Sequence, residues 1–280
     1  MGKAKMLALL SAVLLLFSPS ACRADRSFFL DAALSMLEDG NPFLVHYCEE
    51  NHVRIKADFP LGCPYFWGGR RTDRILEPAS PGQSSEYYQT DRTYLYGLDC
   101  VGFTRWVMVQ CGYAEHDAIS DLLNPSLNRD AVVYQAAKHT GEERVSCLKT
   151  GDLVALRHAS GGYHIAMFIG TLLDFGYTEK NLPEELVPWL HYPLVIHCTG
   201  SSDYHERYRR WLEETGRPDI IPPYGGVIVS LLDVPAEAAP SFTPDAEGLG
   251  KPCFDLEGCH LEILDLSGEK QERWIRWRRE

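Results

Sequence analysis

Positive charge is scarce in this sequence of 280 residues. Lys and Arg together number 27 against 39 Asp and Glu, which gives a formal net charge of −12 at pH 7. A surface of this sign repels phosphate backbones, so we expect no nucleic acid among the partners. The remaining composition, 45% apolar and 24% charged, is that of a globular protein of one or two domains.

The sequence also has no Cys-x-x-Cys pair among its nine cysteines. That spacing is the usual sign of a structural zinc site, so we expect no metal. Most of the cysteines stand singly in apolar sequence, which predicts small buried side chains rather than a disulfide framework. Only Cys253 and Cys259, in a loop-rich stretch, are spaced for a local bridge.

Long apolar runs are absent except near the start. The run Met6–Phe17 is too short to span a bilayer, which needs about 20 residues. Together with the preceding lysines and the following small residues, it predicts a signal peptide over residues 1–24 and a secreted or cell-envelope protein without a transmembrane segment in the mature chain. Cleavage before Cys22 would instead expose a lipidatable cysteine, but Pro19 is an unusual neighbour for that signal, so soluble secretion is favoured.

No internal repeat is visible, and the mature chain is predicted to have four parts. These are an N-terminal helical segment (25–60), a main domain (61–234), a linker or long loop rich in Pro (235–252) and a C-terminal β-hairpin (253–280). The hairpin is predicted to pair 260–266 with 271–277 and is too small to stand alone.

Apolar periodicity predicts helices first and strands afterwards. Helices are expected over 27–38, over 42–48 after the N-cap Asn41, from Cys100 to Cys111 after the N-cap Asp99, and over 204–215. Strands are expected over 152–156, 163–170, 193–198 and 227–232. We therefore predict an α+β fold in which helices pack on an antiparallel sheet.

Cys100 has the setting of a nucleophilic thiol, because the N–H groups at a helix N-terminus stabilise a thiolate. Such a thiol needs a base, itself oriented by a third polar group. His164 and His197 lie on predicted neighbouring strands and could align side by side. Each residue alone is more often a packing residue, but together with the preceding Gly-rich turn their order is papain-like.

Four stretches resemble the NlpC-type cell-wall cysteine peptidases of bacteria, a papain-like family. PYFWGG (64–69) is similar to the family's aromatic turn, and LDCVGF (98–103) to its nucleophile motif. GDLV with HIAMFIG resembles its two following strands, and Ile196-His197 its closing motif. The resemblance covers about residues 60 to 235 and implies that 61–234 is a catalytic domain with insertions.

By this resemblance, Cys100 is the nucleophile, His164 the base and His197 the orienting residue, while Tyr65 and Asp99 lie near the substrate. The sequence departs from the family at Val101, where the family has Ser, and in two long insertions before Cys100 and before His197. His158 and His191 also flank the predicted strands, but they fit the motifs less well.

The resemblance implies a secreted peptidoglycan endopeptidase that cuts a stem-peptide amide next to D-glutamate through a thioester, with no cofactor. Its partner would be the peptidoglycan stem peptide. Two alternatives stay open: a related papain-like amidase acting on another amide bond, and a catalytically silent cell-wall-binding module. The basic strip near the end of the chain, rich in Arg and Trp, is interpreted as a solvated surface.

Overall fold

The computed structural model describes residues 24–56, 61–69, 97–112, 132–135, 145–158, 163–220, 222–234, 253–256, 259–264, 266 and 269–275. The apolar run of the predicted signal peptide, the insertion before Cys100 and the predicted linker over 235–252 lie outside these residues. Within them, no helix combines the length and apolar character needed to cross a membrane.

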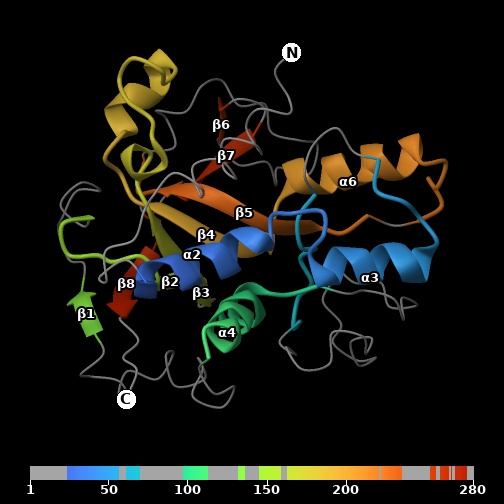
Figure 1. The fold of residues 1–280 in the computed structure, drawn as a ribbon, viewed down its shortest axis with the longest axis horizontal. Helices are drawn as coiled ribbons and strands as arrows, with labels where there is room; N and C mark the ends of the chain where they lie inside the picture. Colours follow the sequence, from blue (N-terminus) through green and yellow to red (C-terminus); the bar gives the residue numbers. More distant parts are fainter. Residues whose placement is uncertain are drawn as a thin grey trace.

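The architecture is α+β, as predicted (Figure 1). The α-helices are α2 (Ala24–Ser35), α3 (Pro42–Asn51), α4 (Cys100–Gln110) and α6 (Ser202–Glu214), with short 3-10 helices η3 (Leu173–Phe175) and η4 (Glu184–Trp189). The strands are β1 (Val132–Gln135), β2 (Leu153–His158), β3 (Tyr163–Gly170), β4 (Leu194–Gly200), β5 (Gly225–Leu232), β6 (Cys253–Leu256), β7 (Cys259–Leu264) and β8 (Glu269–Ile275).

Capping residues set the helix starts largely as the sequence predicted. The Asn41 side chain accepts a hydrogen bond from Leu44 N at 2.9 Å, and Pro42 opens α3. The Ser201 side chain accepts from Tyr204 N in the same way, so α6 begins two residues before the expected position. α2 ends at Ser35, earlier than expected. The next three backbone N–H groups bond the carbonyl oxygen three residues back instead of four, so the α-helix gives way to a tighter turn.

The strands form one sheet in the order β1-β8-β2-β3-β4-β5-β7-β6. The four central strands, β2 to β5, are antiparallel neighbours in chain order. The predicted antiparallel sheet is therefore present, and β7 joins it by pairing parallel to β5.

The predicted C-terminal hairpin of 260–266 with 271–277 is wrong. β7 pairs with β6 and β5, whereas β8 pairs with β2 and β1 on the other side of the sheet. The physical reason is that an isolated two-stranded hairpin is marginal in water, while each open edge of the larger sheet offers backbone partners and a core to pack on. The hairpin that does form joins β6 to β7.

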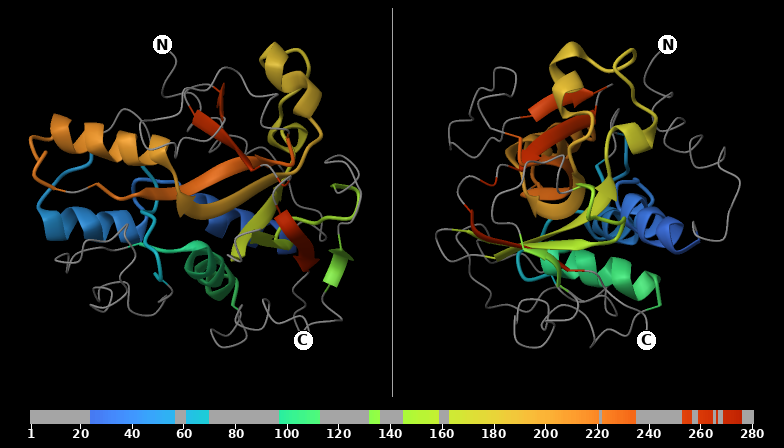
Figure 2. Two further views of the ribbon diagram at one scale, coloured as in Figure 1. Left: turned by 180° about the vertical axis from the view of Figure 1, so that it is seen from behind. Right: turned by 90° about the vertical axis from the view of Figure 1, so that its left-hand side faces the viewer.

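The sheet is rolled rather than flat. In sheet order, five strand spacings lie between β8 and β7, which would separate them by about 24 Å in a flat sheet. The chain from Leu264 to Glu269 reaches at most about 18 Å. Leu266 on this connection is buried against β2, β3, β4 and β5. The joined ends of β7 and β8 are therefore closer together than a flat sheet allows, and Figure 2 shows the strands changing direction across the sheet.

Strand alternation divides the core between two faces of the sheet. On the face that we call the α4 face, Ile165, Met167, Ile196 and Cys198 belong to the cluster that includes α2 and α4. On the opposite face, called the inner face, Ala166, Phe168 and Val195 pack with Leu266. Figure 1 shows α2 and α4 in front of the strands and α3 beside α6 at one end, where their side chains form a further cluster.

Candidate active site

Asp99 fixes the start of the helix that carries Cys100. Its backbone is extended (φ −89°, ψ −177°), and its side-chain oxygen accepts a hydrogen bond from Gly102 N at 2.7 Å. Asp99 is buried, whereas Cys100, the first residue of α4, is half-buried. The helix start and its cap therefore confirm the prediction made from the sequence.

The aromatic turn is fastened to the segment that leads into α4. Leu98 N donates to Pro64 O (3.1 Å), and Phe66 N donates to Leu98 O (2.9 Å), around a parallel bridge between Tyr65 and Leu98. Gly97 is needed here because a Cβ on it would overlap the carbonyl oxygen of Pro64. The turn thus positions the backbone that comes just before Cys100.

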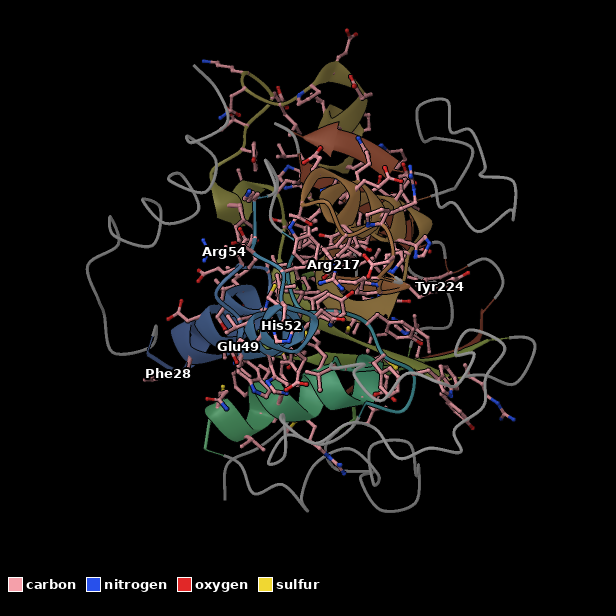
Figure 3. The ribbon with its side chains drawn as sticks, turned by 90° about the vertical axis from the view of Figure 1, so that its right-hand side faces the viewer. Phe28, Glu49, His52, Arg54, Arg217 and Tyr224 are labelled. Atoms are coloured by element: carbon pink, nitrogen blue, oxygen red, sulfur yellow. The ribbon has the colours of Figure 1, made fainter. Side chains whose placement is uncertain are left out.

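The same turn is joined to the sheet. Tyr65 N donates to Gly225 O at 2.8 Å, and Pro64 forms a bridge with Gly226 at the start of β5. The half-buried Tyr65 ring packs against the α4-face cluster. A Cβ built on Gly200 would contact both the Tyr224 ring and the Tyr65 ring, so both rings lie beside Gly200. Tyr224 is labelled in Figure 3. Tyr65 and Tyr224 therefore flank the end of β4.

His164 and His197 form a direct pair. His164 Nε2 lies 2.6 Å from His197 Nδ1, with ring centroids 4.8 Å apart and ring planes at 75°. His164 is half-buried and His197 is 1% exposed. Strand alternation puts both rings on the inner face. His164 shares its side of β3 with Ala166 and Phe168, and His197 shares its side of β4 with Val195. The predicted side-by-side arrangement of the two histidines is therefore present.

Ser230 extends this pair, and the sequence analysis missed it. Its Oγ lies 2.8 Å from His197 Nε2, and Ser230 is 1% exposed. The signal in the sequence was the single hydroxyl in the apolar run of β5, VIVSLL, where a buried polar group requires a partner.

Cys198 connects the histidine pair to the start of α4. It follows His197 in β4, and its thiol donates to Leu98 O, 3.0 Å from Sγ. Burial raises the pKa of Cys198 well above its ordinary value, and the neighbouring Cys63 thiol adds to the shift. Cys198 therefore remains a protonated donor at neutral pH.

The candidate residues thus fall into two groups. Tyr65, Asp99 and Cys100 gather at the start of α4, with Tyr65 and Cys100 packed on the α4-face cluster. His164 and His197 lie on the inner face. His164 is the second residue of β3, so it stands near the N-terminal end of that strand.

The structure also shows where His191 lies and where Val101, the position that differs from the family motif, lies. His191 is exposed in the turn between η4 and β4, whereas the His158 side chain lies outside the described residues. Val101 is buried in the α4-face cluster. Among the side chains that the structure describes, no group of three or more His, Cys, Asp or Glu is arranged to hold a metal ion.

Comparison with known proteins identifies the class. Residues 62–181 match the model of the NlpC/P60 family. This part of the chain is similar to that family, and its mixed helices and sheet agree with a papain-like α+β fold. The match supports a cysteine peptidase of the cell wall in general. It includes Cys100 and His164 and ends before His197. No curated protein and no solved structure matches the chain.

Proposed function

We propose that the protein is an exported peptidoglycan endopeptidase that hydrolyses a stem-peptide amide next to D-glutamate. The observation that carries the proposal is the 2.6 Å contact between His164 and His197, in a chain whose NlpC/P60 segment also supplies a half-buried cysteine at a helix start. In this proposal Cys100 is the nucleophile, His164 the base and His197 the orienting residue.

The pair geometry assigns the ring atoms. His164 directs Nε2 to His197, which leaves Nδ1 as the atom for the thiol proton of Cys100. The resulting thiolate attacks the amide carbonyl carbon and forms a tetrahedral oxyanion. His164 then returns the proton to the leaving amine as the C–N bond breaks. Water, deprotonated by His164, hydrolyses the thioester and regenerates the thiol.

The proposal requires the Cys100 thiol to meet His164 at the start of β3. Two observations support this approach. His164 is half-buried near the strand end, and the bond between Cys198 and Leu98 holds β4 against the residues that precede Cys100. The thiol and imidazole therefore need to meet around the end of the strand rather than through the sheet.

The surroundings of Cys100 suggest where the substrate lies. The Cys100 backbone N–H, at the helix N-terminus, and the Tyr65 side chain would stabilise the oxyanion. Tyr65 and Tyr224 would flank the stem peptide. Asp99 is 4% exposed and caps α4, so we assign it to holding the helix start rather than to direct substrate contact.

Digestion of purified muropeptides tests the proposal. We expect the wild-type protein to release stem fragments, Cys100→Ala and His164→Ala to release none, and all three to keep the same thermal unfolding transition. Mass spectrometry of the products identifies the bond cut. Cleavage between muramic acid and L-alanine would favour the amidase alternative. Wall binding without cleavage by the wild type would favour a silent binding module.

A further inference from the structure

We propose that Ser230 is a positioning residue that fixes the tautomer of His197 and, through it, the protonation of His164. The inference rests on the proposed roles of Cys100 and the histidine pair. It extends the site to a third strand, β5, which lies beyond the part of the chain that matches the family.

The hydrogen-bond geometry permits one productive arrangement. A His164 that holds the thiol proton on Nδ1 carries protons on both ring nitrogens, so its Nε2–H must donate to His197 Nδ1. His197 then carries its own proton on Nε2, which points at Ser230 Oγ 2.8 Å away. The Ser230 oxygen can accept a hydrogen bond from this N–H, whereas the alternative tautomer of His197 would set two N–H groups against each other between the rings.

The position of Ser230 suits this task. Ser230 lies in an otherwise apolar strand and is 1% exposed. Water therefore cannot replace His197 as the hydrogen-bond partner of its hydroxyl, and loss of that bond would be costly. His197 is equally enclosed. Since burial excludes solvent partners from both groups, the Ser230 oxygen is the acceptor within hydrogen-bond distance when His197 carries its proton on Nε2.

The neighbouring strand contributes a charged group on the same face. Glu262 on β7 pairs with Ser230 in register and is 2% exposed, and its carboxylate bonds the hydroxyl of Ser201 at the N-cap of α6. His164, His197, Ser230 and Glu262 thus occupy four consecutive strands, β3, β4, β5 and β7 (Figure 1).

Nitrogen-15 NMR of histidine-labelled protein tests the tautomer directly and without substrate. We expect wild-type His197, assigned by its loss in His197→Gln, to carry its proton on Nε2 with Nδ1 unprotonated. Ser230→Ala should increase the Nδ1–H form, and Ser230→Thr, which keeps the hydroxyl, should restore the wild-type spectrum. Thr215→Val is the matched control. It removes a hydroxyl whose described hydrogen bond is to the carbonyl oxygen of Leu212 in the same helix.

Kinetics provide a second readout. Ser230→Ala should lower kcat about tenfold with KM nearly unchanged, because a hydrogen bond used in the reaction is lost. The pH at which iodoacetamide alkylates Cys100 should move up toward the ordinary thiol value of about 8.5. Thr215→Val should change neither quantity.

The outcomes separate the two proposals. A wild-type His197 protonated on Nδ1, or a Ser230→Ala protein with unchanged tautomer and alkylation curve, overturns the role of Ser230 even if muropeptides are cut. The expected tautomer in a protein that cuts no muropeptide overturns the proposed function and keeps the hydrogen-bond assignment. Because the wild-type tautomer is observed with Ser230 in place, a Ser230→Ala protein that fails to fold does not block the test.

Discussion

The thiol of Cys198 donates a hydrogen bond to the carbonyl oxygen of Leu98, with 3.0 Å between Sγ and oxygen. One partner follows His197 and the other precedes Cys100 by two residues. A contact between segments a hundred positions apart therefore fixes how the histidine strand meets the start of α4.

Replacing His197 should damage catalysis far more than replacing His191. His197 is buried and bonds both His164 and Ser230, whereas His191 is exposed in a turn. We expect His197→Ala to lower kcat about a hundredfold, because the base loses its orienting partner. His191→Ala should stay within about twofold of wild type. Steady-state kinetics on muropeptides, with thermal unfolding as the control, measures both; a larger loss in His191→Ala would move the third role to His191.

Thiol labelling should follow exposure. In the native protein at pH 8, iodoacetamide should modify the half-buried Cys100 and the exposed Cys147, while Cys198 stays unmodified. Cys48 should also resist, because burial, with the nearby Asp39 and Glu49 charges, raises its pKa to about 12 and leaves almost no thiolate. Peptide mass spectrometry locates the label, and the same treatment in urea should label all of them. Native labelling of Cys198 would contradict the packing described above.

Asp99 offers a test of capping against substrate contact. Asp99→Ala removes the acceptor for Gly102 N and should lower the free energy of unfolding by about 1 kcal/mol. Asp99→Asn keeps an acceptor oxygen and should stay near wild type in both stability and activity. Urea unfolding and muropeptide kinetics check the pair. An Asn variant with normal stability and lost activity would assign the carboxylate to the substrate instead.

Gly97 should not tolerate a side chain. A Cβ on Gly97 would overlap the backbone of Pro64, and neither chain segment can move without breaking the bonds between the aromatic turn and Leu98. We expect Gly97→Ala to lower the free energy of unfolding by about 2 kcal/mol or more. Gly40→Ala, where a Cβ meets nothing within 4 Å, should be neutral within about 0.5 kcal/mol. Equal effects of the two changes would show that the turn is looser than described.

Local signals in the sequence were enough to predict the helix starts and the central strands. Asn41 and Asp99 are caps whose side chains bond the next turn, and these short-range interactions act much the same in any fold. The alternation in β3 and β4 likewise predicted which side of each strand the two histidines share. These parts depend on residues close together in the chain.

What the sequence could not predict depends on contacts between distant segments. The partner of His197 on β5 and the parallel pairing of β7 both require the sheet order, which no local pattern specifies. A short apolar run such as β7 fits a hairpin with the strand that follows it as well as a place between β5 and β6, because its periodicity is the same in both. Ser230 was overlooked for the same reason: a hydroxyl in a strand acquires a role only through what lies opposite it.

The division of the segment after residue 253 between the two sides of the sheet has a consequence for how the protein folds. Until β7 and β8 are added, the edges of β5 and β2 are open. The pairing of β2 with β8 joins residues far apart in the sequence, whereas the pairing of β5 with β7 spans a shorter stretch of chain. Such non-local pairing slows folding, and open strand edges invite association between molecules. A chain shortened before β6 should therefore aggregate during expression even though every proposed catalytic residue is present.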